Sequence, residues 1–478
     1  MRNHLFVAAL FATLCASSIY CQISKSAQNE IQTLLSDPEI ASAHVGVHIE
    51  NIKTGEVVYS QNSHKLFLPA SNLKIVTTAC ALSLLGANYQ YKTKLYTDGK
   101  IDNGILQGNL FILGCGDPTI NERHYDSTTQ VFDSWANKLT KMGIRKIEGQ
   151  VIGDITALGN AEIGHGWEKD DLTYYYGART SALSFNDNCV DLTISPALKL
   201  AQPAIITQKP IPGYLKINNH VITTAKNSSR SLKYTRDYTF NGLKISGQMP
   251  LQTVPRLSST PVSNPADFFL ANIVQVFQQH GIGCDSYKIS QSIDYTNKNH
   301  LLTHKSPPLS DIIKVINKQS SNLYAETIWK TIGLEIAGTS SKVVEVEKEF
   351  LEKRGIPAGD IFIADGSGLS RHNMIAPHQI IQVLKYMHSS PHAKVFLDSL
   401  AISGKDGTLK NRWQKNNAAG SIFAKSGSLT RVNALSGYIH SKTGDKYAFS
   451  IMINNYKGKS TAIRNLQDQM TTVVYDID

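Results

Sequence analysis

The chain has 478 residues, of which 41% are hydrophobic and 18% are charged, and its formal net charge is +10 at pH 7. This composition can bury a sizeable core and excludes a disordered chain. At roughly 150 residues per domain, the length predicts about three domains. The positive charge forms no basic runs with interleaved aromatic residues. We therefore predict a generally cationic surface, with the excess spread along the chain, and no nucleic-acid partner.

The N-terminus has the pattern of a secretory signal. Arg2 supplies a positive charge, and Leu5–Leu14 is an apolar run too short to span a bilayer. We predict a signal peptide over residues 1–21, export to the periplasm or cell envelope, and no transmembrane anchor. Neither Cys15 nor Cys21 follows a small residue, which favours a soluble exported protein over a lipid-anchored one. The cleavage point stays open, as does the disulfide state of the later cysteines Cys80, Cys115, Cys189 and Cys284.

The two ends of the chain predict one mixed α/β body. Pro69-Ala70-Ser71 opens a predicted helix that ends at Gly86. A helical spacing of apolar residues over 463–473 predicts a C-terminal packing helix. Alternating apolar residues predict a pair of strands before each of these two helices. The pairs are His44–Ile52 with Glu56–Ser60, and Ala434–His440 with Tyr447–Asn454.

The middle of the chain has the character of an insertion. Turn signals are dense from about residue 89 to 302, and short alternating runs such as Tyr214–Thr224 and Lys233–Ser246 predict a small β domain over residues 191–261. Asn264-Pro265 caps a predicted helix that stops at Gly281. Two further helices, Leu309–Lys318 and Asn322–Ala337, follow the insertion.

The first chemical motif is Ser71-Asn72-Leu73-Lys74. A serine at a helix N-terminus lies where free N–H groups and the helix dipole favour a developing alkoxide. Lys74 is three residues later and returns to the same face. A serine hydroxyl is a poor nucleophile until a neighbour takes its proton, which a lysine of lowered pKa can do. The motif alone also fits an N-cap serine beside an exposed lysine.

Ser320-Ser321-Asn322, at the junction of the two predicted helices, is the second candidate element. A serine and an asparagine two residues apart on a tight turn can face the same cleft. The serine hydroxyl could relay a proton, and the amide could hold a carbonyl or the lysine. The pattern also occurs at Ser60-Gln61-Asn62 and Ser184-Phe185-Asn186, and only the helix–turn–helix setting favours the third occurrence.

The third element is a Lys-(Ser/Thr)-Gly sequence on a strand. Lys425-Ser426-Gly427-Ser428 follows an apolar run and offers a cation, two hydroxyls and a glycine that permits close backbone approach. Lys53 and Lys442 begin similar sequences, but these occupy predicted hairpin turns and are followed by Glu56 and Asp445. Because an acid disfavours a substrate carboxylate, we choose Lys425.

Together the three elements resemble the serine penicillin-binding proteins and β-lactamases. Longer strings are similar to the low-molecular-mass class C branch of D-alanyl-D-alanine carboxypeptidases/endopeptidases, and the resemblance covers essentially the whole mature chain. It implies a penicillin-binding/β-lactamase-like transpeptidase domain over residues 22–88 and 303–478. It also implies an inserted domain over 89–190 and 262–302 with the β domain nested in it. The strings are 114–119, 181–188, 365–373 and 404–409.

The resemblance implies acyl transfer on peptidoglycan stem peptides, inhibition by β-lactam antibiotics, and no cofactor or metal. Ser71, Lys74, Ser320, Asn322 and Lys425 are then the catalytic residues, and Ser426, Gly427 and Ser428 bind substrate. The backbone N–H groups of Ser71 and Ser428 would form the oxyanion hole. Two residues depart from the family pattern: Ser321 stands where aspartate is usual, and Ser426 replaces the usual threonine.

A further hypothesis concerns the third residue of the stem peptide. In a Gram-negative-type wall this is meso-diaminopimelate, whose side chain ends in an amine and a carboxylate. Residues 171–176 resemble the segment that family members place over the cleft. We expect Asp171 to pair with the amine, Arg371 with the carboxylate, and Tyr176 to pack on the methylenes. The alternative is a loop-capping Asp171 and a surface Arg371.

Four other functions compete with this interpretation. A zinc peptidase lacks support because the sequence contains no His-Glu-x-x-His, and an α/β-hydrolase because it contains no Gly-x-Ser-x-Gly. A β-lactamase-like hydrolase and a non-catalytic penicillin-binding envelope protein stay open as alternatives. The balance of carboxypeptidase and endopeptidase activity, the rate of β-lactam deacylation and the oligomeric state are not determined by the motifs.

Overall fold

The computed structural model describes residues 25–159, 163–237 and 241–477. The predicted signal peptide lies outside the described residues. In the described part of the chain, the expected mixed α/β fold is confirmed. The chain forms two compact units. The first contains the described residues up to Ala87 together with 313–321 and 343–477, and the second contains 88–312 and 322–342.

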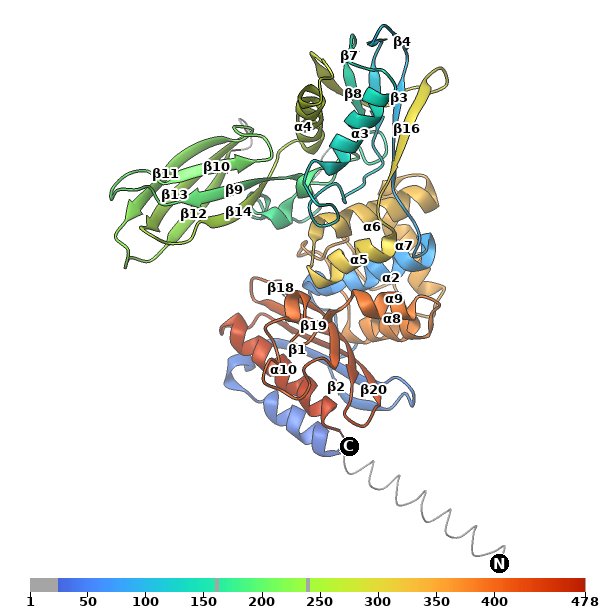
Figure 1. Ribbon diagram of the computed structural model, residues 1–478. Coiled ribbons are helices and arrows are strands. Elements are labelled where there is room, and N and C mark those ends of the chain that lie inside the picture. Colours follow the sequence, from blue (N-terminus) through green and yellow to red (C-terminus); the bar gives the residue numbers. More distant parts are fainter. Residues whose placement is uncertain (1–24, 160–162, 238–240, 478) are drawn as a thin grey trace, which may run out of the picture. The chain divides into compact units, whose positions relative to one another are not determined.

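An antiparallel sheet of six strands forms the centre of the first unit (Figure 1). Its strand order is β17 (Ala401–Ile402), β18 (Ile422–Leu429), β19 (Val432–His440), β20 (Lys446–Asn454), β1 (His44–Asn51) and β2 (Val57–Gln61). Nearly every residue of β1, β19 and β20 is buried, on both faces of the pleat. Helices must therefore cover both faces of this sheet.

One face packs on α10 (Ser460–Tyr475) and on a helical segment over residues 25–34. The predicted C-terminal packing helix is confirmed, because Ile463, Leu466 and Met470 are buried there against Ile31 and Ile451. The opposite face packs on α8 (Pro377–Ser389), which in turn contacts α2 (Leu73–Leu85) and α9 (Ala393–Ser399); α2 also contacts α7 (Val343–Glu352). This second layer of helices carries the serine motif.

The second unit contains a five-stranded sheet and most of the inserted sequence. The sheet has the order β15 (Tyr287–Ser290), β8 (Val151–Asp154), β6 (Leu110–Leu113), β3 (Lys92–Thr97) and β16 (Asn299–Lys305). A smaller sheet joins β4 (Lys100–Asp102), β5 (Ile105–Gln107) and β7 (Lys146–Ile147). The helices α3 (Gln130–Lys141), α4 (Pro265–Gln279) and α6 (Asn322–Ala337) belong to the same unit.

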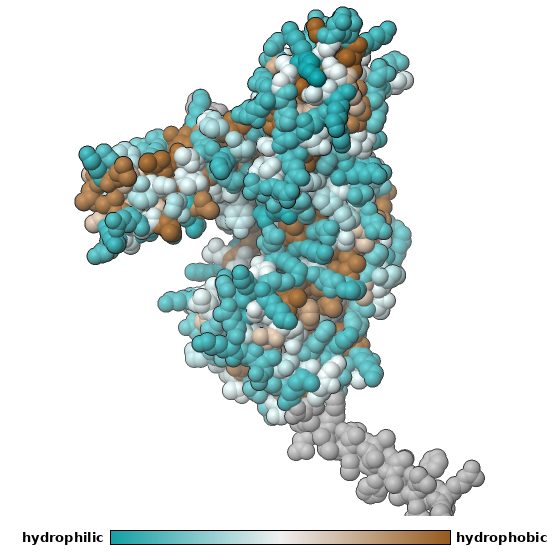
Figure 2. Space-filling model, viewed as in Figure 1, coloured by the Kyte–Doolittle hydropathy of each residue, from teal (hydrophilic) through white to brown (hydrophobic). Residues whose placement is uncertain are grey.

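The stretch expected as a β domain forms two three-stranded sheets. One joins β10 (Ile205–Lys209), β9 (Cys189–Ser195) and β14 (Arg256–Pro261); the other joins β11 (Lys216–Thr224), β13 (Gly242–Pro250) and β12 (Ser231–Asp237). The expected run Lys233–Ser246 is thus divided between β12 and β13. Figure 2 shows hydrophobic residues gathered at the surface of this β domain.

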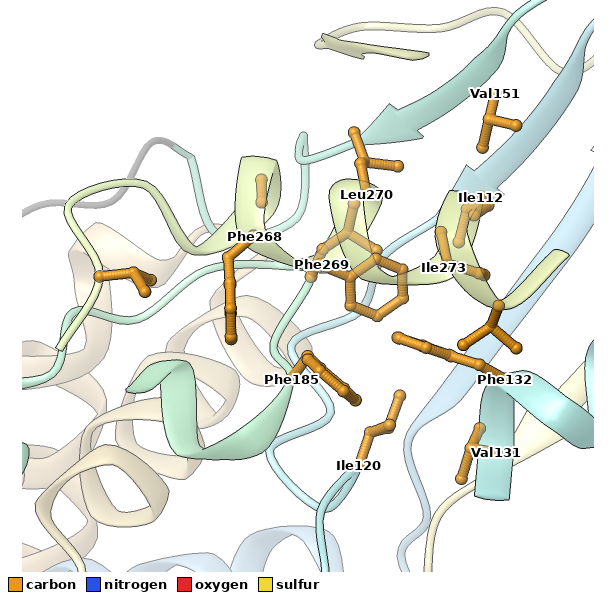
Figure 3. Packing of buried hydrophobic residues seen from close by; sticks show 14 of the residues in the cluster. Ile112, Ile120, Val131, Phe132, Val151, Phe185, Phe268, Phe269, Leu270 and Ile273 are labelled. Carbon is orange, nitrogen blue, oxygen red and sulfur yellow. The ribbon is translucent and has the colours of Figure 1, made fainter. Parts of the chain in front are cut away.

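The core of the second unit is rich in aromatic side chains (Figure 3). Phe132 of α3 stacks on Phe185 at 4.6 Å between ring centroids and meets Phe269 of α4 edge-on at 4.8 Å. Ile112 and Val151 bring the sheet into the same cluster. The apolar face that the sequence gives α4 is therefore buried against both α3 and β8.

The observed grouping differs in part from the expected boundaries. Residues 303–312 and 322–342 were expected in the catalytic domain, but they group with the second unit because α6 bonds to the inserted chain. Tyr91 Oη lies 3.0 Å from Thr331 Oγ1, and Asn121 Nδ2 donates to Tyr324 Oη. The division into three domains remains a prediction. Within the described ranges, no helix is both long and apolar enough to cross a membrane.

Candidate active site

Ser71 and Lys74 lie side by side at the start of α2. Ser71 occupies a single 3₁₀ turn, η2 (Ala70–Asn72), and the α-helix begins at Leu73, so the expected α-helical N-terminus is shifted by two residues. Lys74 is fully buried, and its Nζ donates to Ser71 Oγ at 3.0 Å and to the carbonyl oxygen of Ser367 at 2.5 Å. The sequence spacing thus does bring the amine to the hydroxyl, and the lysine is not exposed.

Two glycines let neighbouring backbone approach Ser71 closely. A Cβ added to Gly427 of β18 would stand 3.0 Å from the backbone nitrogen of Ser71 and 2.8 Å from the carbonyl oxygen of Pro69. Gly368 has φ +79°, and a Cβ there would overlap the carbonyl oxygen of Ala70. Strand β18 and the 366–368 loop therefore enclose the serine turn at distances that only glycine permits.

Lys425 reaches the same place from β18. Ile422 and Ala424 face the α10 side of the sheet, so strand alternation turns Lys425 and Gly427 toward the α2 side. Lys425 is fully buried, and its Nζ donates to Ser320 Oγ at 2.8 Å and to the carbonyl oxygen of Ser426 at 2.6 Å. Burial, with a smaller contribution from the positive charge of Lys74, lowers the pKa of Lys425 well below its ordinary value.

Ser320 occupies a strained turn after α5 (Leu309–Lys318). Its φ is +60°, a left-handed conformation that serine rarely adopts, and its side chain is half-buried beside Lys425. The end of α5 is held by an ion pair of 2.5 Å between Lys318 and Asp406. A backbone held in such a conformation by its surroundings is common at functional sites.

The two competing lysines lie elsewhere in the first unit. Lys53 is exposed in the turn that joins β1 and β2, where its backbone N–H donates to Asn51 Oδ1 at 2.9 Å. Lys442 is exposed in the turn that joins β19 and β20. Both positions are those expected from the turn chemistry in the sequence.

The rest of the Lys-Ser-Gly-Ser sequence offers hydroxyls on the same strand. Ser426 Oγ donates to Thr408 Oγ1 at 2.7 Å, which ties β18 to the 404–409 string. Ser428 is exposed and so is open to a ligand. Thr408 was not singled out from the sequence; its only signal there was its place in that string.

The 365–373 loop also contributes to the candidate site, near which the family resemblance leads us to expect it. Asp365 is fully buried, and its carboxylate accepts hydrogen bonds from the backbone N–H groups of Gly368 and Ser370, at 2.8 and 2.7 Å, and from Asn373 Nδ2 at 2.8 Å. This network fixes the carbonyl oxygen of Ser367 that binds Lys74. Ser367 was missed because a backbone acceptor leaves no mark on residue type.

A second group of candidates lies in the second unit. Asn322 begins α6, two residues after Ser320, and its Nδ2 donates to the carbonyl oxygen of Tyr176 at 2.9 Å. Tyr176 belongs to η4 (Tyr175–Gly177) and follows η3 (Asp171–Thr173). Burial, with a smaller contribution from the charge of Asp171, raises the pKa of Tyr176 to about 12. Asn322, Tyr176 and Asp171 are thus neighbours.

Arg371 belongs to the first unit, where the 365–373 loop meets the chain just after β18. Its Nη1 donates to the carbonyl oxygen of Thr430 at 3.3 Å, two residues after Ser428, and its side chain is half-buried. Asp171 and Arg371 therefore lie in different units, and their joint recognition of a zwitterion stays a prediction. In the part of the chain that the structure describes, no three His, Cys, Asp or Glu side chains are grouped to hold a metal ion, and the four cysteines are free thiols.

A family model described as D-Ala-D-Ala carboxypeptidase 3 (S13) matches residues 27–476. The chain belongs to this family. Among curated proteins it is similar to a D-alanyl-D-alanine carboxypeptidase of Actinomadura sp. (29% identity; 90% of this chain, 81% of the relative). It is also similar to the D-alanyl-D-alanine carboxypeptidase DacB of Haemophilus influenzae (29% identity; 87% of this chain, 86% of the relative).

The solved structures agree with this assignment. The crystal structure of penicillin binding protein 4 (dacB) from Haemophilus influenzae superposes with a TM-score of 0.80 at 27% identity, covering 93% of this chain and 98% of that one. A predatory peptidoglycan endopeptidase from Bdellovibrio bacteriovorus shares the fold at 18% identity and a TM-score of 0.52. The resemblance to low-molecular-mass class C penicillin-binding proteins is confirmed, as is the expected enzyme class, a serine D-Ala-D-Ala carboxypeptidase, through the family.

Proposed function

We propose that this protein cleaves the D-Ala-D-Ala ends of peptidoglycan stem peptides, and crosslinks of the same chemistry, through an acyl-enzyme on Ser71. The observation that carries the proposal is the buried Lys74 amine 3.0 Å from the Ser71 hydroxyl. A half-buried serine beside a buried amine is the arrangement that nucleophilic catalysis needs. Family membership supplies the substrate class.

In the acylation step, Lys74 takes the proton of Ser71 while the serine oxygen attacks the carbonyl carbon of the penultimate D-alanine. The carbonyl oxygen of Ser367 accepts a hydrogen bond from the Lys74 amine and so holds this amine beside the Ser71 hydroxyl. Because the carbonyl is neutral, it orients the lysine without adding a charge to the site. The backbone N–H groups of Ser71 and Ser428 are the proposed oxyanion donors. Gly427 supports this role because it leaves the space beside the Ser71 nitrogen free of a side chain.

Lys425 and Ser320 form the second half of the proposed machinery. Ser320, hydrogen-bonded to Lys425, passes a proton to the leaving amine as the peptide C–N bond breaks. Lys425, Ser426 and Ser428 hold the terminal carboxylate, and Asn322 orients the peptide. Water then hydrolyses the ester on Ser71 and frees the serine. In a crosslinked substrate the leaving amine belongs to a second stem peptide, and the same steps give endopeptidase cleavage.

The same site accounts for penicillins as covalent inhibitors. The strained amide of a β-lactam corresponds to the D-Ala-D-Ala peptide bond, and its carboxylate corresponds to the terminal carboxylate of the peptide. Ser71 therefore attacks the β-lactam by the same route. The Haemophilus influenzae protein has a crystal structure in complex with a β-lactam, at 26% identity and a TM-score of 0.75. For the location of the protein we propose export by a signal peptide over residues 1–21 and residence in the periplasm or cell envelope.

Incubation with a muropeptide pentapeptide and with a crosslinked dimer, followed by mass spectrometry, tests the proposal. We expect loss of one D-alanine from the first and monomers from the second, and no product with Ser71→Ala. Absence of both products in the wild type, with intact covalent penicillin labelling, would favour the non-catalytic alternative. Rapid β-lactam turnover without peptide cleavage would favour the β-lactamase-like one.

A further inference from the structure

The positive charge of the chain is concentrated in the β domain, which corrects the expectation of an even spread. Residues 191–261 contain nine lysines and arginines and only two aspartates, a net charge of +7, whereas the whole chain carries +10. Eight of the nine basic residues are exposed, Arg236 being the buried one. This domain therefore presents a strongly cationic surface.

Three loops meet at one end of the β domain, opposite the end where Cys189 pairs with Pro261. We call this end the tip and define it by loops 196–204, 225–230 and 251–255 with the strand residues Ile205, Ile222, Arg256 and Leu257. The first loop is held by mutual backbone hydrogen bonds with Thr223, and Leu251 N donates to the carbonyl oxygen of Thr224 at 2.9 Å. The three loops are thus fixed side by side on the end of β11.

The tip exposes large apolar side chains. Six of the fourteen exposed large hydrophobic residues among those that the structure describes belong to it. Leu198 and Val254 are 94% and 77% exposed, and Leu257 is 70% exposed. The others are Leu200, Ile205 and Ile222. Figure 2 shows this hydrophobic surface at the outer end of the domain, next to hydrophilic residues. Such clusters mark contact sites with proteins or membranes.

The basic residues of the tip alternate with its apolar ones. Lys199 lies between Leu198 and Leu200, and Arg256 lies between Val254 and Leu257, while the middle loop adds Lys226 and Arg230. No acidic residue occurs from position 192 to 236. The two aspartates of the domain lie at its other end, where Asp191 pairs with Lys209 and Asp237 with Gly242. The tip is therefore apolar and cationic without compensating charge.

We propose that the tip binds the surface of an anionic phospholipid bilayer, with its leucines and valine among the acyl chains and its lysines and arginines on the phosphates. In such peripheral binding, the burial of apolar side chains and the attraction of cations to anionic lipid both contribute to the binding free energy. Each lysine or arginine near the bilayer surface strengthens the attraction. The proposal goes beyond the peptidase function, because it gives the enzyme a second binding surface in a part of the chain remote in sequence from Ser71.

The chemistry of the tip disfavours the other occupants. A second copy of this chain would bring four cations against four cations with no acid between them, which repels. Lysine is depleted in the cores of protein interfaces, whereas here Lys199 lies between two exposed leucines. A lipid surface accepts both kinds of side chain, since the phosphates lie directly above the hydrocarbon.

Flotation with phosphatidylglycerol/phosphatidylcholine vesicles tests the proposal, using the chain from residue 22 so that the apolar Leu5–Leu14 segment is absent. We expect binding that weakens at high salt and is at least tenfold weaker with phosphatidylcholine alone. The variant L198S/L200S should reduce binding at least tenfold and K199S/R256S similarly, with turnover of a soluble pentapeptide unchanged because both pairs are far in sequence from the catalytic motifs.

Matched controls separate the tip from general charge and hydrophobicity. K233S/K244S removes the same charge from exposed strand positions of the same domain, and F362S removes a 59%-exposed aromatic from the other unit; both should bind within about threefold of wild type. Unchanged binding of L198S/L200S, equal losses in K233S/K244S, or absence of vesicle binding would overturn the proposal. So would a wild-type dimer in sedimentation that L198S/L200S converts to monomer.

Discussion

Replacing Lys425 with methionine distinguishes two effects of the buried lysine, its contribution to kcat/KM and its effect on the free energy of unfolding. Lys425 Nζ donates to Ser320 Oγ at 2.8 Å, and a hydrogen bond from a charged group contributes about 1.5–3 kcal/mol. Loss of that interaction in the transition state lowers kcat/KM by about 10- to 100-fold. Loss of the cation facing the substrate carboxylate adds to the effect. Methionine is one heavy atom shorter than lysine and equally unbranched, so the strand needs little rearrangement.

The same variant should not lose stability. Burial and Lys74 lower the pKa of Lys425 in the folded protein from its ordinary value of 10.5, so over the pH range between the two pKa values the unfolded chain binds more protons. Wild-type stability therefore rises as pH increases through that range, which lies below 10.5, and the contribution disappears in Lys425→Met. At pH 7 we expect a Tm equal to or above that of wild type.

Steady-state hydrolysis of a D-Ala-D-Ala peptide and thermal unfolding at several pH values measure both effects. Lys442→Met, in an exposed turn, is the matched control and should change neither quantity. The reasoning fails if Lys425→Met keeps kcat/KM within twofold of wild type, or if Lys442→Met loses as much. A fall in Tm of many degrees in Lys425→Met would mean that the buried cation stabilises the fold.

Three other predictions follow from the site. Ser71→Ala should abolish covalent labelling by fluorescent penicillin and leave Tm within a degree or two; labelling that survives would move the nucleophile elsewhere. Gly427→Ala should lower the rate of penicillin acylation strongly, because its Cβ would stand 3.0 Å from the Ser71 nitrogen, whereas Gly359→Ala, with open space around it, should not; equal rates would remove the oxyanion argument. For a diaminopimelate peptide and a peptide with a neutral residue at that position, Asp171→Ala should reduce the ratio of the two kcat/KM values by about 10- to 100-fold. A mutant that keeps the full preference places that pocket elsewhere.

Local periodicity in the sequence was enough to find most elements. The bounds expected for Leu309–Lys318 and Asn322–Ala337 agree with α5 and α6, because both helices begin and end at short-range signals. The spacing of Ser71 and Lys74 is also local, since residues three apart share a helix face. The run Lys233–Ser246 was predicted less well, because alternation alone does not mark where one strand ends and the next begins.

The choice of Lys425 over Lys53 and Lys442 came from neighbouring acids and turns in the sequence. The structure adds the reason for its position, which is strand alternation in a sheet covered on both faces. It also shows partners that residue types could not reveal. The carbonyl oxygen of Ser367 lies 293 positions from Lys74 along the chain, and Ser320 lies 105 positions from Lys425.

The sequence by itself therefore determined the family, the serine motif and the character of the helices and strands, since each depends on residues that are neighbours along the chain. Only the tertiary structure decided which backbone atoms surround Ser71, and that Gly368 and Gly427 make room for them. Only it gathered six exposed apolar side chains and four cations at one end of the β domain. These arrangements depend on how distant strands pair and how loops meet, and no short-range pattern encodes such contacts.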